Sequence, residues 1–194
     1  TYTNNSSKQL INGGIETKFL ESHELKWRVN FLKWFTLNTD VLSGRKANFS
    51  LLFANRNYQI DMLEAESKIS YQPGTVFRIS ASYKYSEKRN TYELANEKAF
   101  INTFGSEIKY NQTDKGSILA RADFHLIYFN GSNASAVAYE MLSGLNKGEN
   151  FTWELSYQRN VNANVQISIN YNGRKTGTSS NIVHVGGGTV RAYF

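Results

Sequence analysis

The chain contains no cysteine, and its 194 residues include only one proline and two methionines. The absence of cysteine excludes a disulfide framework, a thiolate metal site and a cysteine nucleophile. Long apolar runs are also missing, since the longest cover only a few residues, as at 50–54. A membrane-spanning helix needs about 20 apolar residues, so the sequence predicts no such helix.

The beginning of the chain has no methionine and no basic stretch followed by an apolar one, so no signal peptide is visible. We therefore expect a mature product or a piece of a longer polypeptide. Aromatic residues are abundant at 14%, alongside 40% hydrophobic residues and a net charge of +6. The mean hydropathy is nevertheless negative. This combination suits a protein whose surface alternates between apolar and polar rows.

Apolar and polar residues alternate with a period of two along much of the chain, which is typical of β-strands. The clearest run is 151–158, and the pattern resumes at 165–172 after an asparagine-rich turn, which predicts a hairpin. In the run at 116–129, Leu119 and Ile127 interrupt the polar face. Nine strands are predicted in all, at 12–28, 33–46, 58–71, 76–88, 97–111, 116–129, 150–160, 164–174 and 182–194.

Several of these runs exceed the usual strand of about 5–6 residues and match the roughly 9–11 residues that cross a bilayer at a tilt. The connections alternate between short turns and longer loops. Short turns on one rim and long loops on the other are typical of bacterial outer-membrane barrels. The fold class predicted is therefore all-β, an antiparallel up-and-down transmembrane β-barrel.

In such a barrel the apolar face meets lipid and the polar face lines the lumen. Aromatic residues gather near strand ends, as in the girdles at the headgroup levels. Lipid-facing residues are expected at Phe77, Ile79, Tyr83, Phe124, Trp153, Leu155, Tyr157, Val165, Ile167, Ile169 and Tyr171. Lumen-lining residues are expected at Glu64, Arg78, Lys84, Glu107, Lys109, Arg121, Asp123, His125 and Glu154.

Val190, Ala192 and Phe194 repeat at a spacing of two and end on an aromatic residue. This ending resembles the carboxyl-terminal signal by which outer-membrane barrels are recognised for assembly. The segments 141–153, 171–175 and 184–194, with 22 asparagines in the chain, resemble the ends of large Bacteroidota outer-membrane proteins. The resemblance implies a place in the outer membrane and the barrel-assembly machinery as a partner.

Barrels of this kind keep both termini in the periplasm and use an even number of strands. With Phe194 in the periplasm, the odd count makes 1–11 an extracellular loop or strand connection, and 12–194 the barrel strands. The odd count favours the C-terminal part of a larger barrel. The alternative is a missed strand, for example within 134–142, where the alternation is weak.

The charged residues of the polar face either line a pore or substrate path or form a salt-bridged wall. Cationic side chains near the outer rim could bind the phosphates of lipopolysaccharide, and generic rim charge is the alternative. These residues are Arg45, Lys46, Arg56, Lys88, Arg89, Lys147, Arg174 and Lys175. The aromatic residues are not interleaved with a basic patch, so nucleic acid is not an expected partner.

An enzyme is not expected, and neither is a cofactor or a metal. His23, His125 and His184 lie far apart, without metal-ligand spacing. No nucleophile motif accompanies His125 and Asp123, and no helix follows the glycines at 186–188 to make a phosphate loop.

The sequence thus predicts a non-enzymatic outer-membrane barrel, the C-terminal part of a larger transport, secretion or assembly-complex barrel. A small complete structural or adhesive barrel is the first alternative, and a soluble ligand-binding barrel is the second. Outer-membrane lipids are expected partners, together with other outer-membrane proteins or lipoproteins.

Overall fold

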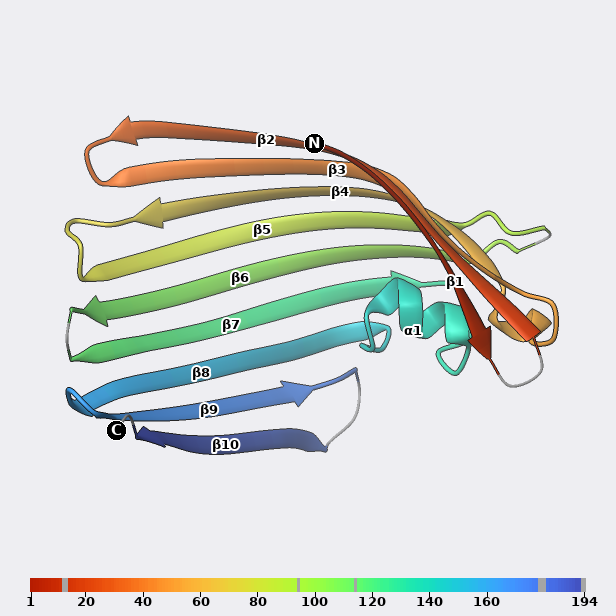
Figure 1. Cartoon of the computed structure of the whole chain (residues 1–194). Helices are drawn as coiled ribbons and strands as arrows, with labels where there is room; N and C mark the ends of the chain where they lie inside the picture. The colour runs from red at the N-terminus through yellow and green to blue at the C-terminus, as the bar shows by residue number, and fades with distance from the viewer. Residues whose placement is uncertain (12–13, 94, 114, 178–180, 193–194) are drawn as a thin grey trace.

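The computed structural model of this chain describes residues 1–11, 14–93, 95–113, 115–177 and 181–192. Within these ranges ten strands form one antiparallel sheet, in which every strand pairs with its neighbours in sequence (Figure 1). The strands are β1 (Tyr2–Ile11), β2 (Gly14–Leu32), β3 (Phe35–Ser50), β4 (Tyr58–Tyr71), β5 (Phe77–Asn90), β6 (Lys98–Gln112), β7 (Gly116–Phe129), β8 (Gly148–Asn162), β9 (Val165–Lys175) and β10 (Ile182–Ala192). The predicted all-β, up-and-down antiparallel architecture is confirmed.

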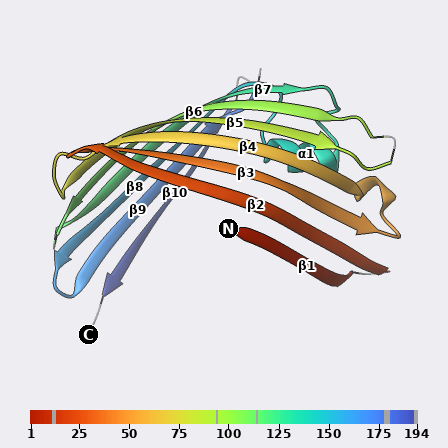
Figure 2. The ribbon, with the colours of Figure 1, turned by 90° about the horizontal axis from the view of Figure 1, so that it is seen from above.

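The sheet curves into an arch, and β1 and β10 form its two edges (Figure 2). No pairing joins these edges within the described ranges, so the sheet is open there. One end of the sheet carries short turns, such as the one between Leu32 and Phe35, and is called the turn rim. The other end, the loop rim, carries the 3-10 helix η1 (Ala54–Arg56) and the helix α1 (Ala136–Leu142).

Two sequence-based expectations are corrected at the strand level. The segment 1–11, expected as an extracellular loop or strand connection, contains the strand β1, which pairs with residues 14–23 of β2. This strand lacks an apolar alternation because its side chains from Thr3 to Gln9 are polar on both faces. The segment 134–142, considered as a missed strand, contains the helix α1 instead.

The helix α1 is short, but both of its ends are capped. The Ser135 hydroxyl accepts a hydrogen bond from the Ala138 N–H, and Ser143 ends the helix in the left-handed conformation with φ 55°. The buried residues of α1 lie on one stripe, as expected for an amphipathic helix. They are Val137, Ala138, Met141 and Leu142.

The stripe of α1 packs on the concave side of the arch and forms the hydrophobic core of the described residues (Figure 2). The strand residues in this core are Tyr58, Ile60, Ala99, Ile101, Ile127 and Phe129. Ile127, which interrupts the polar alternation of its strand, is therefore covered by the helix.

The strand register sorts the remaining side chains onto the two faces of the sheet. Since Ala99 and Ile101 lie under α1, the odd-numbered residues of β6 face the concave side. The pairings then place all of the predicted lumen-lining residues on the concave face and all of the predicted lipid-facing residues on the convex face. The two predicted rows are thus two faces of one sheet.

The convex face carries an apolar band that ends before the loop rim. On β5 the convex side chains from Phe77 to Tyr85 are apolar or aromatic, and Glu87 and Arg89 follow. On other strands, too, a charged residue on the convex face marks the end of the band. These residues are Glu21, Arg45, Asp61, Lys98, Glu149 and Lys175. β1 pairs with β2 from His23 towards the loop rim. Of the ten described strands, all except β1 therefore contribute to the apolar band.

Candidate functional site

The concave face holds a group of charged residues that the strand register brings together. We call this group the concave charge network: Glu64, Lys68, Arg78, Lys84, Lys88, Glu107, Arg121 and Asp123. Its members come from β4, β5, β6 and β7, because the register aligns their polar rows side by side. Opposite charges on neighbouring strands stabilise such an alignment.

Each glutamate of the network is held by two cations from other strands. The Glu107 carboxylate lies 3.1 Å from Lys68 Nζ and 3.3 Å from Arg78 Nη2. The Glu64 carboxylate lies 2.6 Å from Lys84 Nζ and 3.8 Å from Lys88 Nζ. The negative charges of these carboxylates are therefore balanced by cations on the same face of the sheet.

A second polar group extends the network towards β8. Arg121 Nε lies 2.8 Å from Asp123 Oδ2, and the ring of His125 lies between two hydroxyls, with Thr103 Oγ1 at 2.9 Å and Thr152 Oγ1 at 3.2 Å. Both ring nitrogens of His125 therefore have a hydroxyl within hydrogen-bond distance. Lys109 and Glu154, also predicted for this face, have no ion-pair partner among the described residues.

Polar anchors hold α1 against the network at the loop rim. Glu140 forms an ion pair with Lys46 of β3, and Lys88 Nζ donates a 3.0 Å hydrogen bond to the Met141 carbonyl at the end of the helix. Tyr58 also lies beside Glu140. These anchors were not predicted from the sequence, because nothing in the strand pattern indicates that a loop folds back onto the sheet.

Two groups next to α1 lie beyond the apolar band and have shifted pKa values. Burial lowers the pKa of the Lys88 ammonium, and the nearby Glu64 carboxylate opposes that shift. Burial, together with the negative charge of Glu140, raises the pKa of Tyr58 to about 12. Tyr58 is therefore a neutral hydrogen-bonding group at neutral pH.

Most of the cations expected at the outer rim contact a partner within the chain. Arg45 pairs with Asp61 at 2.6 Å and Arg89 with Glu87 at 2.6 Å, while the Arg56 guanidinium lies 4.9 Å from the centre of the Phe53 ring. Lys46 and Lys88 hold α1. Among the described residues, the expected rim cations with neither an ion-pair partner nor an aromatic ring contact are Lys147, Arg174 and Lys175.

An aromatic cluster lies on the convex face of β8, β9 and β10. The Trp153 ring lies over Gly173, where a Cβ atom would overlap it. The Tyr171 hydroxyl lies 2.7 Å from His184 Nδ1, and the His184 ring is 5.9 Å from Trp153. Glycine at position 173 is thus what lets the Trp153 indole lie flat along the sheet.

The residues of the predicted assembly signal follow this cluster. Val190 and Ala192 pair with Ile167 and Val165 and share the convex face with them. Phe194 lies outside the described residues. The glycines at 186–188 border open space rather than a close neighbour, because a Cβ atom on any of them would meet at most a backbone oxygen at 3.8–3.9 Å.

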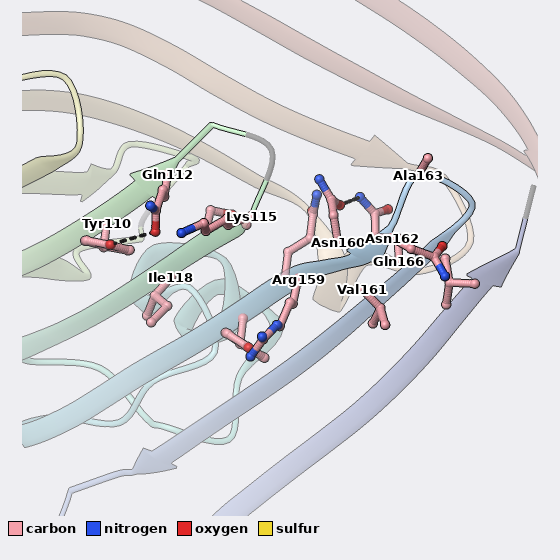
Figure 3. A pocket seen from close by; sticks show the side chains of 15 residues that line it. Tyr110, Gln112, Lys115, Ile118, Arg159, Asn160, Val161, Asn162, Ala163 and Gln166 are labelled. Carbon is pink, nitrogen blue, oxygen red and sulfur yellow. Dashed lines mark hydrogen bonds between the residues drawn. The ribbon is translucent and has the colours of Figure 1, made fainter.

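A groove of about 1050 Å³ lies at the turn rim, between the ends of the β6–β7 and β8–β9 hairpins (Figure 3). Amides and the cations Lys115 and Arg159 line it, and Tyr110 donates a 3.1 Å hydrogen bond to Gln112 beside it. The described residues that line the groove include no carboxylate and no histidine.

Neither a protein-family model nor a curated protein matches this chain. The described residues contain no group of His, Cys, Asp and Glu that could hold a metal ion. No helix among them has the length and apolar character to cross a membrane.

Proposed function

We propose that this chain is a non-enzymatic segment of an integral β-barrel in a bacterial outer membrane. The apolar band carries this proposal. Along β7 it runs from Ile118 to Tyr128, about 33 Å of strand at about 3.3 Å per residue. A tilt of about 40° projects this length to about 25 Å, which is the height of the apolar band of outer-membrane barrels.

Exposure on the convex face supports the same conclusion. In a water-soluble protein the apolar face of a sheet is covered by a second layer, but α1 packs on the opposite face. Large side chains of the band are left open, with Leu25 71%, Trp27 64% and Tyr128 64% exposed. Lipid is the solvent that accommodates such a surface.

The proposed role is that of the C-terminal part of a larger transport, secretion or assembly-complex barrel, with the concave charge network facing the lumen. The proposed source is a Bacteroidota-type bacterium, because of the resemblance at the C-terminal end. The proposed partners are outer-membrane lipids, the barrel-assembly machinery at Val190, Ala192 and Phe194, and other outer-membrane proteins or lipoproteins. Lipopolysaccharide phosphates would meet Lys147, Arg174 and Lys175.

A structural or adhesive barrel is the second candidate. The observation that favours it is the concave face itself, because Glu64 and Glu107 are already neutralised and α1 covers the loop-rim end. A wall of this kind does not need to conduct solutes. Ionic conductance of the complete barrel in planar bilayers separates the two candidates, since persistent silence favours the structural role.

We expect the protein to require detergent or lipid for solubility and to migrate faster in unheated than in heated samples on denaturing gels. The reason is that a membrane barrel keeps its hydrogen-bonded strands in detergent until heat separates them. Gel electrophoresis with and without boiling measures this shift, and a urea-unfolded sample is the control. A monodisperse protein in buffer without detergent would contradict lipid contact along the band.

A further inference from the structure

We propose that the groove at the turn rim binds one anionic glycerophospholipid, with the lipid phosphate between Lys115 and Arg159 and an acyl chain along the convex face of β7. The inference rests on the proposed membrane function and names the class of lipid that this part of the sheet selects. We call the groove, which is lined from the segments 110–118 and 157–166, the headgroup groove.

Backbone hydrogen bonds fix the turn between β6 and β7 beside β8. The Lys115 N–H donates a 3.1 Å hydrogen bond to the Gln112 carbonyl, and the Asn160 N–H donates a 3.0 Å hydrogen bond to the Lys115 carbonyl. Next to Lys115, Gly116 has a φ of 144°, and a Cβ atom there would overlap the Gln158 carbonyl oxygen. Glycine at 116 therefore permits the close approach that holds the backbone of Lys115 in place.

Two cations line the headgroup groove, and the described lining residues include no carboxylate that would balance them. Lys115 comes from the β6–β7 turn and Arg159 from β8 (Figure 3). Neither forms an ion pair in the part of the chain that the structure describes. Asp114, which precedes Lys115, lies outside that part. Ammonium and guanidinium groups bind phosphate oxygens through charge-assisted hydrogen bonds, so the groove favours a phosphate that carries no amine.

Arg159 lies at the depth where a bilayer carries its phosphates. It faces the convex side and ends the apolar band of β8 at the turn rim. Tyr110, Ile118 and Tyr157 form the convex row beside it, one step further into the band. Tyrosine rings of this kind mark the headgroup level of a bilayer. Short turns lie in the periplasm and lipopolysaccharide occupies the opposite leaflet, so the occupant at this rim is a glycerophospholipid.

A second hollow, of about 490 Å³, adjoins the headgroup groove on the convex face. Ile118 lines the groove, while Ala120 and Ala122, on the same face of the same strand, line the hollow. The hollow lies where the small side chains of Ala81, Ser106 and Ala122 share one row across three strands. Its other convex side chains are apolar or aromatic. A lipid fills both spaces, with its phosphate in the groove and its acyl chain in the hollow, whereas a free phosphate fills only the groove.

Native mass spectrometry of the full protein, extracted from its membrane in a mild detergent, tests the site through the lipid that stays bound. With phosphatidylglycerol as the added probe, Lys115→Ala combined with Arg159→Ala should weaken binding about tenfold or more. The matched control, Lys147→Ala combined with Lys175→Ala, removes the same charge at the loop rim and should bind like the wild type. Wild-type binding by the groove variant, or an equal loss in the control, would overturn the proposal.

Ala122→Leu tests the acyl chain, because it fills the hollow with an apolar side chain and leaves both cations in place. It should weaken phosphatidylglycerol binding several-fold. Phosphatidylethanolamine, whose amine has no acidic partner among the described lining residues, should bind more weakly than phosphatidylglycerol, and glycerol phosphate should not be retained. Retention of glycerol phosphate as strong as that of the lipid, equal binding of the two lipids, or wild-type binding by Ala122→Leu each contradicts the proposed occupant.

Failure of this site is distinguishable from failure of the membrane proposal. Heat-modifiable migration on gels verifies that each variant has assembled, and carbonate extraction of the wild type is scored separately. A wild type released as a soluble protein would refute the membrane proposal, and the headgroup groove with it. A membrane-embedded wild type that binds phosphatidylglycerol no better than its groove variant refutes the headgroup groove alone.

Discussion

Leu155→Arg is expected to lower the free energy of unfolding of the lipid-embedded protein by about 2–4 kcal/mol. Leu155 lies on the convex face of β8, between the charges of Glu149 and Arg159 that bound the band on this strand. An arginine there would place its guanidinium in hydrocarbon near the middle of the bilayer. Urea titration in phospholipid vesicles, followed by tryptophan fluorescence, measures the change.

Ser156→Arg is the matched control, one residue further along the same strand. Ser156 faces the concave side, where its hydroxyl donates a 2.9 Å hydrogen bond to Asn170 Oδ1. Loss of one exposed hydrogen bond costs only about 1 kcal/mol, and the new side chain can reach water. Equal losses in the two variants would contradict the assignment of lipid to the convex face.

Replacement of residues 135–143 by a glycine–serine linker of equal length is expected to raise single-channel conductance several-fold. The helix α1 covers the concave face at the loop rim, where Met141 and Leu142 are almost fully buried against the strands. Its removal would widen the lumen of the complete barrel at that end. Planar-bilayer recordings measure the conductance.

Tyr139→Ala is the control for this experiment, because Tyr139 lies on the outer side of α1 and is 72% exposed. It should leave conductance unchanged. Glu140→Ala, which removes the partner of Lys46, should produce brief openings between the two extremes. If the linker variant conducts like the wild type, α1 does not obstruct the path and the pore assignment loses its support.

Strand positions could be predicted from the sequence because each strand has one apolar and one polar face. The predicted strands 58–71 and 116–129 coincide with β4 and β7, and the others differ from the observed strands by a few residues at their ends. β1 could not be found in this way. It lies beyond the apolar band, where both of its faces meet a polar environment and no alternation is required.

The concave charge network was predicted by face, but its ion pairs were not. Alternation places Glu107 and Arg78 on one side of their strands, whereas their contact depends on the register between β5 and β6. The helix α1 accounts for the apolar Ile127 within a polar row. Its capping serine and its i, i+4 apolar pairs were too few for a helix to be predicted.

Lipid contact along the convex face can be measured directly, because the chain has no cysteine and accepts single spin labels without background. Labels placed at each position from 151 to 158 in vesicles would report collisions with oxygen, which concentrates in lipid, and with a water-soluble nickel chelate. We predict a period of two, with oxygen favoured at the odd positions Phe151, Trp153, Leu155 and Tyr157, and nickel at the even ones. Nickel access at all positions, or the opposite phase, would contradict an outward-facing apolar band.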